Sequence, residues 1–163
     1  MSPQADQFMN VAQEYCAFIE SLQDSDDLLM DELGRLLPQL HAAITALGEL
    51  DERSGYVSKV DLDQRFELYS RLHEVLGELD AYWMEFDVGQ TNQEKSGSLA
   101  DDLTDIYCDL KSGLEKVDKQ DDVRQALSEL HATYKMHWGQ HLVDAERHLY
   151  ELSAREMPSR PSN

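Results

Sequence analysis

Apolar residues recur every three or four positions along most of the chain, which is the pattern of amphipathic helices. One series runs from Phe8 to Leu22, and a second runs from Leu29 to Leu47. A third series, 62–86, includes a heptad spacing from Tyr69 onward and predicts a long bundle helix that ends near Phe86. No stretch alternates apolar with polar residues as a half-buried strand would. The pattern predicts an all-helical protein.

Capping residues and a proline divide these series. Ser25, Asp61 and Ser98 stand where N-caps are expected, and their side-chain oxygens can accept from the first free amides of a helix. Pro38 has no amide hydrogen to donate to the carbonyl of Gly34, so we expect a kink or a break in the second helix.

The second half of the chain continues the helical pattern. Residues 88–97 have the composition of an exposed loop, and apolar positions then recur from Leu99 to Val117. The short polar link DKQDD leads to a last helix over about residues 123–152. We predict one all-α domain, residues 1–153, built as a bundle of five or six helices with the last two as antiparallel neighbours, and a disordered tail over 154–163.

The net charge of the chain limits the kinds of molecule that it is expected to bind. The 163 residues include 14 Lys and Arg against 33 Asp and Glu, a formal net charge of −19. Such a field repels nucleic acids and anionic membranes. It is most often a well-solvated acidic surface, and its functional interpretations are a basic protein partner, cations, or mimicry of a polyanion. The chain begins without a basic region followed by an apolar one, and no apolar run approaches the ~18 residues of a membrane span, so we expect a cytoplasmic protein. The pattern does not indicate an oligomeric state.

The two cysteines, Cys16 and Cys108, lie far apart in the sequence and form no CxxC pair. We therefore expect reduced thiols rather than a disulfide framework or a zinc knuckle.

Polar residues interrupt the apolar stripe of the last helix in the segment KMHWGQHLVDAERHL. His137, His141, Asp144 and His148 fall on this stripe or at its edge, so each needs a polar partner if the helix packs as predicted. Gly139 costs about 1 kcal/mol relative to Ala inside a helix, which suggests that another group comes close to its backbone.

The preceding helix supplies counterparts, because its spacing places three aspartates together beside its apolar stripe. The two helices together predict a candidate polar binding cluster that consists of Asp102, Asp105, Asp109, His137, Trp138, His141 and Asp144.

Three interpretations of this cluster remain open. In the first, His137 and His141 bind a divalent metal ion, because imidazole and carboxylate ligands suit zinc, manganese or iron. One or two of Asp102, Asp105, Asp109 and Asp144 complete the shell, with Asp105 as the named candidate. In the second, an Asp-His pair acts as a general acid or base. In the third, the histidines and carboxylates form a structural network that fixes the helix register. No Glu-x-x-His or HExxH motif and no recognisable nucleophile motif occurs, so no catalytic residue is assigned and enzymatic activity stays open. Apart from such a metal ion, no cofactor is expected.

Four segments of the chain, LLPQLHAAITALGEL, LDAYWMEFD, GSLADDLTDIYCDLKSGL and HWGQHLVDAERHLYEL, resemble in this order the bacterial family called domain of unknown function 5063. The resemblance covers about residues 36–152 and implies a compact all-helical bundle. It implies no activity. The matched polar and aromatic positions are Asp101, Asp102, Asp105, Tyr107, Asp109, Lys111, His137, Trp138, His141 and Asp144.

From the sequence we expect a small, acidic, cytoplasmic protein that acts as a non-catalytic binding or accessory module for a protein partner. The alternative is a metal-binding protein or a metal-dependent enzyme that uses the His/Asp cluster between the last two helices.

Overall fold

The structure is a computed structural model, and it describes residues 1–23, 28–50, 60–85, 94–119 and 123–156. Helices account for most of these residues, as the apolar spacing predicts, and the all-α fold class is confirmed. In chain order the elements are α1 (Pro3–Ser21), α2 (Leu29–Ala46), α3 (Leu62–Leu76), the 3-10 turn η1 (Gly77–Leu79), β1 (Ala81–Glu85), β2 (Glu94–Ser98), α4 (Leu99–Lys119), α5 (Val123–Thr133), the π-helical turn η2 (Tyr134–Trp138) and α6 (Gly139–Arg155).

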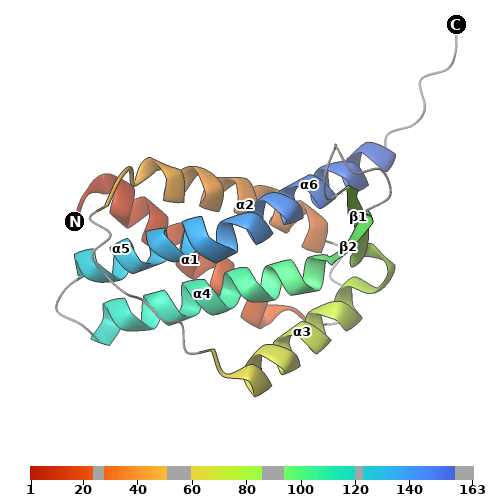
Figure 1. Ribbon diagram of the computed structural model, residues 1–163, viewed down its shortest axis with the longest axis horizontal. Helices are drawn as coiled ribbons and strands as arrows, with labels where there is room; N and C mark the ends of the chain where they lie inside the picture. The colour runs from red at the N-terminus through yellow and green to blue at the C-terminus, as the bar shows by residue number, and fades with distance from the viewer. Residues whose placement is uncertain (24–27, 51–59, 86–93, 120–122, 157–163) are drawn as a thin grey trace, which may run out of the picture.

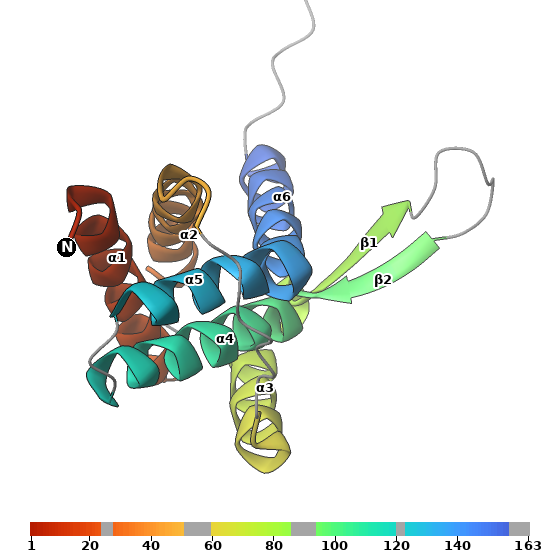
Figure 2. The ribbon, with the colours of Figure 1, turned by 60° about the vertical axis from the view of Figure 1, so that its left-hand side comes forward.

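The helices pack around α4, which lies at the centre of the bundle. Figure 1 shows α5 and α6 as one long rod that runs beside α4 in the opposite direction. Figure 2 shows α1 and α2 on one side of this pair, α3 below α4, and the β1–β2 hairpin projecting away from the helices. The predicted antiparallel packing of the last two helices is therefore present, and the last one consists of α5, η2 and α6.

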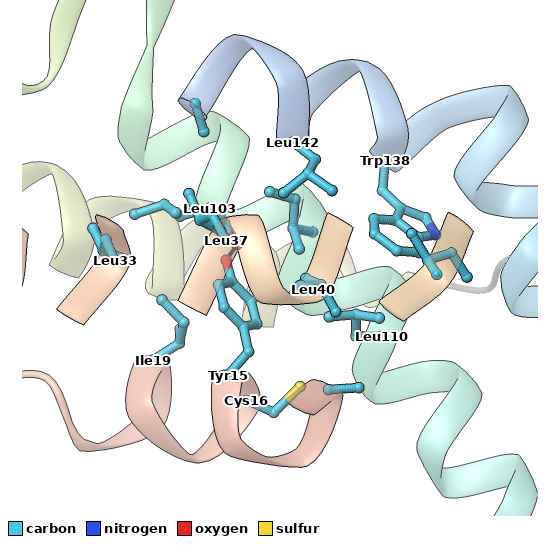
Figure 3. Close-up of a cluster of buried hydrophobic side chains, with 14 of the residues drawn as sticks. Tyr15, Cys16, Ile19, Leu33, Leu37, Leu40, Leu103, Leu110, Trp138 and Leu142 are labelled. Carbon is cyan, nitrogen blue, oxygen red and sulfur yellow. Dashed lines mark hydrogen bonds between the residues drawn. The ribbon is translucent and has the colours of Figure 1, made fainter. Parts of the chain in front are cut away.

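The core lies where α1, α2, α4 and η2 meet. Figure 3 shows Tyr15, Leu37, Leu103 and Trp138 converging from these four elements. All four are fully buried. The hydroxyl of Tyr15 donates to the carbonyl oxygen of Leu103 at 2.8 Å, so the polar end of this ring is satisfied inside the apolar core.

The third predicted helix is wrong beyond residue 76. At Gly77 the chain adopts a left-handed conformation with φ 53°, and β1 follows after the turn η1. Trp83, expected in the core, lies in β1 and is 67% exposed, while Phe66 of α3 is also 67% exposed. Phe86 lies outside the described residues. The heptad spacing was misleading because a short strand with apolar residues can match it by chance.

β1 and β2 form an antiparallel hairpin, so the predicted absence of strands and the predicted loop at residues 94–97 are also wrong. Residues 88–93 of that loop lie outside the described residues. Tyr82 pairs with Gly97, and a Cβ at Gly97 would come within 2.2 Å of the Tyr82 ring. Glycine is therefore needed at this position so that the ring can lie across the neighbouring strand.

Two of the predicted N-caps are confirmed. Asp61 accepts from the amide of Gln64 at 3.3 Å, and the hydroxyl of Ser98 accepts from the amide of Asp101 at 3.2 Å. Buried Asp80 adds a cap that the sequence did not suggest, because it accepts from the amide of Ala100 at 2.6 Å. Ser25 lies outside the described residues.

α2 continues through Pro38 to Ala46, so the predicted break is not observed there. At the other end of the chain, α6 extends to Arg155, past the predicted start of the tail at residue 154. Among the described helices, none combines the length and the hydrophobicity that a membrane crossing requires.

Candidate metal centre

Three buried carboxylates line the side of α4 that faces the last helical rod. Asp102, Asp105 and Asp109 are spaced by three and four residues, so they occupy one face of the helix. Taking a carboxylate out of water is costly unless it is paired. Their burial therefore requires partners from the neighbouring elements.

Histidines from the rod provide these partners. Nδ1 of His137, in η2, lies 2.6 Å from Oδ2 of Asp109. Nδ1 of His141, in α6, lies 2.7 Å from Oδ1 of Asp102, and its Nε2 lies 3.1 Å from Oδ2 of Asp105. The earlier aspartate of α4, Asp102, contacts the later histidine of the rod, His141, and the later aspartate, Asp109, contacts the earlier histidine, His137. This order is what antiparallel packing requires. The structure thus brings together five of the seven residues of the predicted cluster.

The three residues predicted as metal ligands lie close to one another. Asp105, His137 and His141 can each offer one ligand atom, and these atoms lie within 4.8 Å of each other. Asp101, Asp102 and His141 form a second group of this kind, which shares the His141 ring. The rings of His137 and His141 meet edge to face with centroids 5.0 Å apart. Two imidazoles and a carboxylate at this spacing can surround a single cation.

Both ring nitrogens of His141 face carboxylates, and this arrangement changes its acidity. Burial by itself would lower the pKa of His141, but the hydrogen bond to Asp102 and the charges of Asp105 and Asp102 outweigh it, so the pKa is raised above 6.5. Burial also raises the pKa of Asp102. Both shifts have the same consequence: the folded cluster holds protons to a higher pH than the same groups in water.

The cluster opens to solvent at His137. The side chain of His137 is 51% exposed, whereas that of its partner Asp109 is 4% exposed. Burial raises the pKa of Asp109, and the hydrogen bond to His137 opposes this rise. A ligand can therefore reach the cluster from the His137 side without opening the bundle.

Two residues that the sequence pattern did not point to, one in α3 and one in β1, also contact these aspartates. Arg65 of α3 places Nε 2.9 Å from Oδ1 of Asp105 and Nη2 2.7 Å from Oδ1 of Asp101. Tyr82 of β1 donates its hydroxyl hydrogen to Oδ2 of Asp102. The guanidinium offsets part of the negative charge, and the tyrosine fixes the orientation of Asp102.

His148 supports the cluster from beneath the hairpin. It is buried, its Nε2 donates to the carbonyl oxygen of Leu79 at 2.6 Å, and its ring packs on Tyr82 with centroids 4.7 Å apart. The sequence placed His148 on the apolar stripe, where it does lie. Its ring contacts Leu79 and Tyr82 and so helps to hold the Tyr82 ring in place.

Trp138 and Asp144, the other two predicted cluster members, have contacts elsewhere. Trp138 is fully buried, and its indole N–H lies 3.2 Å from the carbonyl oxygen of Leu130 and 3.1 Å from Oγ1 of Thr133. Asp144 accepts from Nε2 of Gln140 at 3.1 Å. Trp138 thus anchors the π turn to the core, and Asp144 lies at the margin of the cluster.

The π turn explains the glycine of the HWG segment. A Cβ at Gly139 would lie 2.4 Å from the carbonyl oxygen of Tyr134 and 2.9 Å from its ring. The close approach predicted at Gly139 is therefore present, and it comes from the preceding turn of the same rod. Such π turns, with one extra residue per turn, often occur at functional sites.

Two further histidines and the two cysteines lie outside the predicted ligand set. His41 pairs with Glu146 at 2.8 Å and His73 with Asp80 at 2.5 Å, both away from the three predicted ligands. Both cysteines are free thiols, and burial raises the pKa of Cys108 to about 11. At neutral pH this thiol is protonated, which makes it a poor nucleophile and a poor metal ligand.

Two positions of the family motif tie the bundle together. The hydroxyl of Tyr107 donates to Oε1 of Glu20 at 2.7 Å, and Nζ of Lys111 donates to the same oxygen at 2.5 Å. These contacts join α4 to α1 and do not reach the cluster.

Comparisons with known proteins agree with the fold. The family model described as domain of unknown function (DUF5063) matches residues 1–155. The crystal structure of protein BF1032 from Bacteroides fragilis is similar with a TM-score of 0.77 and 23% sequence identity, and the match covers 93% of this chain and 96% of that chain. At this identity the likeness shows the fold alone. A search of curated proteins found no significant match.

Proposed function

The chain belongs to the DUF5063 family, and we propose that it binds a divalent transition-metal ion through Asp105, His137 and His141. Zinc and ferrous iron suit this ligand set, because both accept imidazole nitrogen together with carboxylate oxygen.

The observation that carries the proposal is the hydrogen bonding behind the two histidines. In metal sites, a ligating histidine generally donates its second ring N–H to a carboxylate or carbonyl, which fixes the ring and makes the first nitrogen a better ligand. His137 and His141 both place Nδ1 against a buried carboxylate, at 2.6 and 2.7 Å. Nε2 is then the nitrogen that would bind a cation on each ring, and on His141 the cation would replace the proton shared with Oδ2 of Asp105, 3.1 Å away.

The third proposed ligand, Asp105, is also held in place by a neighbouring polar side chain. Asp105 uses Oδ1 for the guanidinium of Arg65, at 2.9 Å, and turns Oδ2 toward His141. With three protein ligands and an exposed His137, the ion keeps a position open to water, which is the arrangement of catalytic rather than structural zinc sites. The proposal itself is limited to binding.

The direct test is metal analysis of the chain purified without a histidine tag, together with thermal melts with and without a chelator. We expect stoichiometric metal. An ion held at about 100 times its Kd adds about 2.7 kcal/mol of stability, so the chelator should lower the Tm by roughly 5–10 °C. His141→Ala should abolish both effects. His41→Ala is the matched control and should retain both, because His41 pairs with Glu146 outside the proposed ligand set.

The structural network is the competing interpretation, and the same experiment separates it. If the wild type carries no metal, is not stabilised by added Zn²⁺ or Fe²⁺, and still loses stability in His141→Ala, the cluster holds the helices in register without binding an ion.

A further inference from the structure

An apolar groove lies between α2 and α6, on a different side of α6 from the proposed metal ligands. Its volume is about 570 Å³, within the range of about 300–1,000 Å³ that is usual for ligand sites. Gly34 and Pro38 of α2, Leu79 of η1, and Leu149 and Tyr150 of α6 contribute to its lining.

The groove lies where α2 carries two residues with little side-chain volume. Gly34 has no side chain, and a Cβ placed there would meet no atom of residues 1–23, 28–50, 60–85, 94–119 or 123–156 within 4 Å. Pro38 follows one turn later on the same side of the helix, and its compact ring also leaves space.

Large apolar side chains are exposed beside this gap. Tyr150 is 73% exposed and Leu79 is 41% exposed. Single exposed apolar residues need no explanation, but these two belong to the lining and extend its apolar surface to the edge of the groove.

The charge at the groove selects the kind of partner. Of the described residues that line it, Asp31, Glu146 and Glu156 are acidic and Arg155 is basic. The whole chain carries a formal charge of −19, so its field attracts cationic partners and repels anionic ones over distances of about a Debye length. An apolar floor with an acidic rim complements a segment that is apolar on one side and basic on the other.

We propose that this groove binds a basic amphipathic helical segment of a partner protein, with its apolar side chains over Gly34 and Pro38 and its Lys or Arg residues against Asp31 and Glu156. The proposal does not depend on metal binding.

The probe is a fluorescein-labelled helical peptide with Leu at positions i, i+3, i+4 and i+7 and Lys elsewhere, titrated with the full chain and followed by fluorescence anisotropy. We expect saturable binding that weakens as salt is added. A peptide with Glu in place of every Lys should bind at least about tenfold more weakly, because its charge repels the acidic rim.

The variant Gly34→Leu tests whether the peptide binds in the groove. The added side chain enters open space, so it fills the groove without a clash and should weaken binding about tenfold or more. Ala42→Leu places the same side chain at an exposed position of α2 outside the groove and should leave binding unchanged. Thermal melts of both variants check that they fold. The double variant Asp31→Lys, Glu156→Lys should weaken binding and reduce its dependence on salt.

Three results would overturn the proposal. Equal binding by Gly34→Leu and the wild type would place the peptide elsewhere on the acidic surface. A tenfold gain in affinity on shortening the chain to end at residue 156 would make residues 157–163 the occupant of the groove. A dimer in sedimentation that Gly34→Leu dissociates would make a second copy the occupant.

Discussion

Two sides of α6 differ in how their space is filled. Toward α4, carboxylates and imidazoles face each other at hydrogen-bonding distance, and residues from α3 and β1 complete their contacts. Toward α2, a hollow of about 570 Å³ remains, with apolar side chains at its edge. The first side is polar and already ordered, whereas the second is apolar and open.

Two helical glycines show this difference at single positions. Gly139 is needed because a Cβ there would come within 2.4 Å of the Tyr134 carbonyl oxygen, whereas a Cβ at Gly34 would contact nothing within 4 Å. Glycine in a helix costs about 1 kcal/mol relative to alanine. At Gly139 the packing of the π turn explains this cost. At Gly34 no contact with the described residues explains it, and the proposed partner segment would complete this surface.

Replacing each of these glycines by alanine should change the free energy of unfolding in opposite directions, and this is the largest effect on stability that we predict. Gly139→Ala should lower the free energy of unfolding by about 1–3 kcal/mol, because the added methyl group forces the Tyr134 turn to shift. Gly34→Ala should raise it by up to about 1 kcal/mol, because it adds helix propensity without a clash. Urea denaturation of both variants measures the difference. If both substitutions stabilise the protein equally, the π turn relaxes freely and the contrast between the two sides fails.

The next largest effect tests whether the carboxylates that are hydrogen-bonded to the proposed histidine ligands increase the affinity for metal. Asp109→Asn should weaken metal binding about 10- to 100-fold, because the carboxylate that orients His137 and increases its basicity becomes a neutral amide. Asp118→Asn, an exposed change on the same helix, removes the same charge and should leave the affinity within about twofold. Competition with a chromogenic chelator gives both affinities. Equal losses in the two variants would mean that overall charge, rather than the orientation of His137, sets the affinity.

The pairing of α4 with the last rod could be predicted from the sequence because all its signals are local. Asp102, Asp105 and Asp109 share a helix face by their spacing, as do His137 and His141, and the short link DKQDD leaves antiparallel packing as the simple arrangement. The contacts of Asp109 with His137 and of Asp102 with His141 follow from that register.

The residues that complete the cluster could not be predicted, because their positions depend on long-range packing. Arg65 lies on a polar face of α3 and meets Asp105 only where α3 crosses α4. Tyr82 was assigned to a helix, since its segment follows a heptad, and the strand is decided by the left-handed Gly77 and by pairing with residues 94–98. The apolar residues on either side of the π turn each keep helical spacing, so periodicity alone does not reveal the turn between them.

The smallest predicted effect tests whether the polar side is built to hold protons when no metal is bound. The pKa of His141 is raised by Asp102 and Asp105, so above pH 6.5 the folded state binds this proton more tightly than the unfolded state. The resulting stabilisation is fully present below pH 6.5 and is lost as the pH rises through the folded-state value. In a chelator-containing buffer, the stability of the wild type minus that of His141→Gln should therefore fall as the pH rises above 6.5. An NMR titration of the His141 ring would give the folded-state value directly. A difference that stays flat or grows with pH would mean that the two carboxylates do not hold a proton on this ring, and the polar side of α6 would then be ordered by packing rather than by charge.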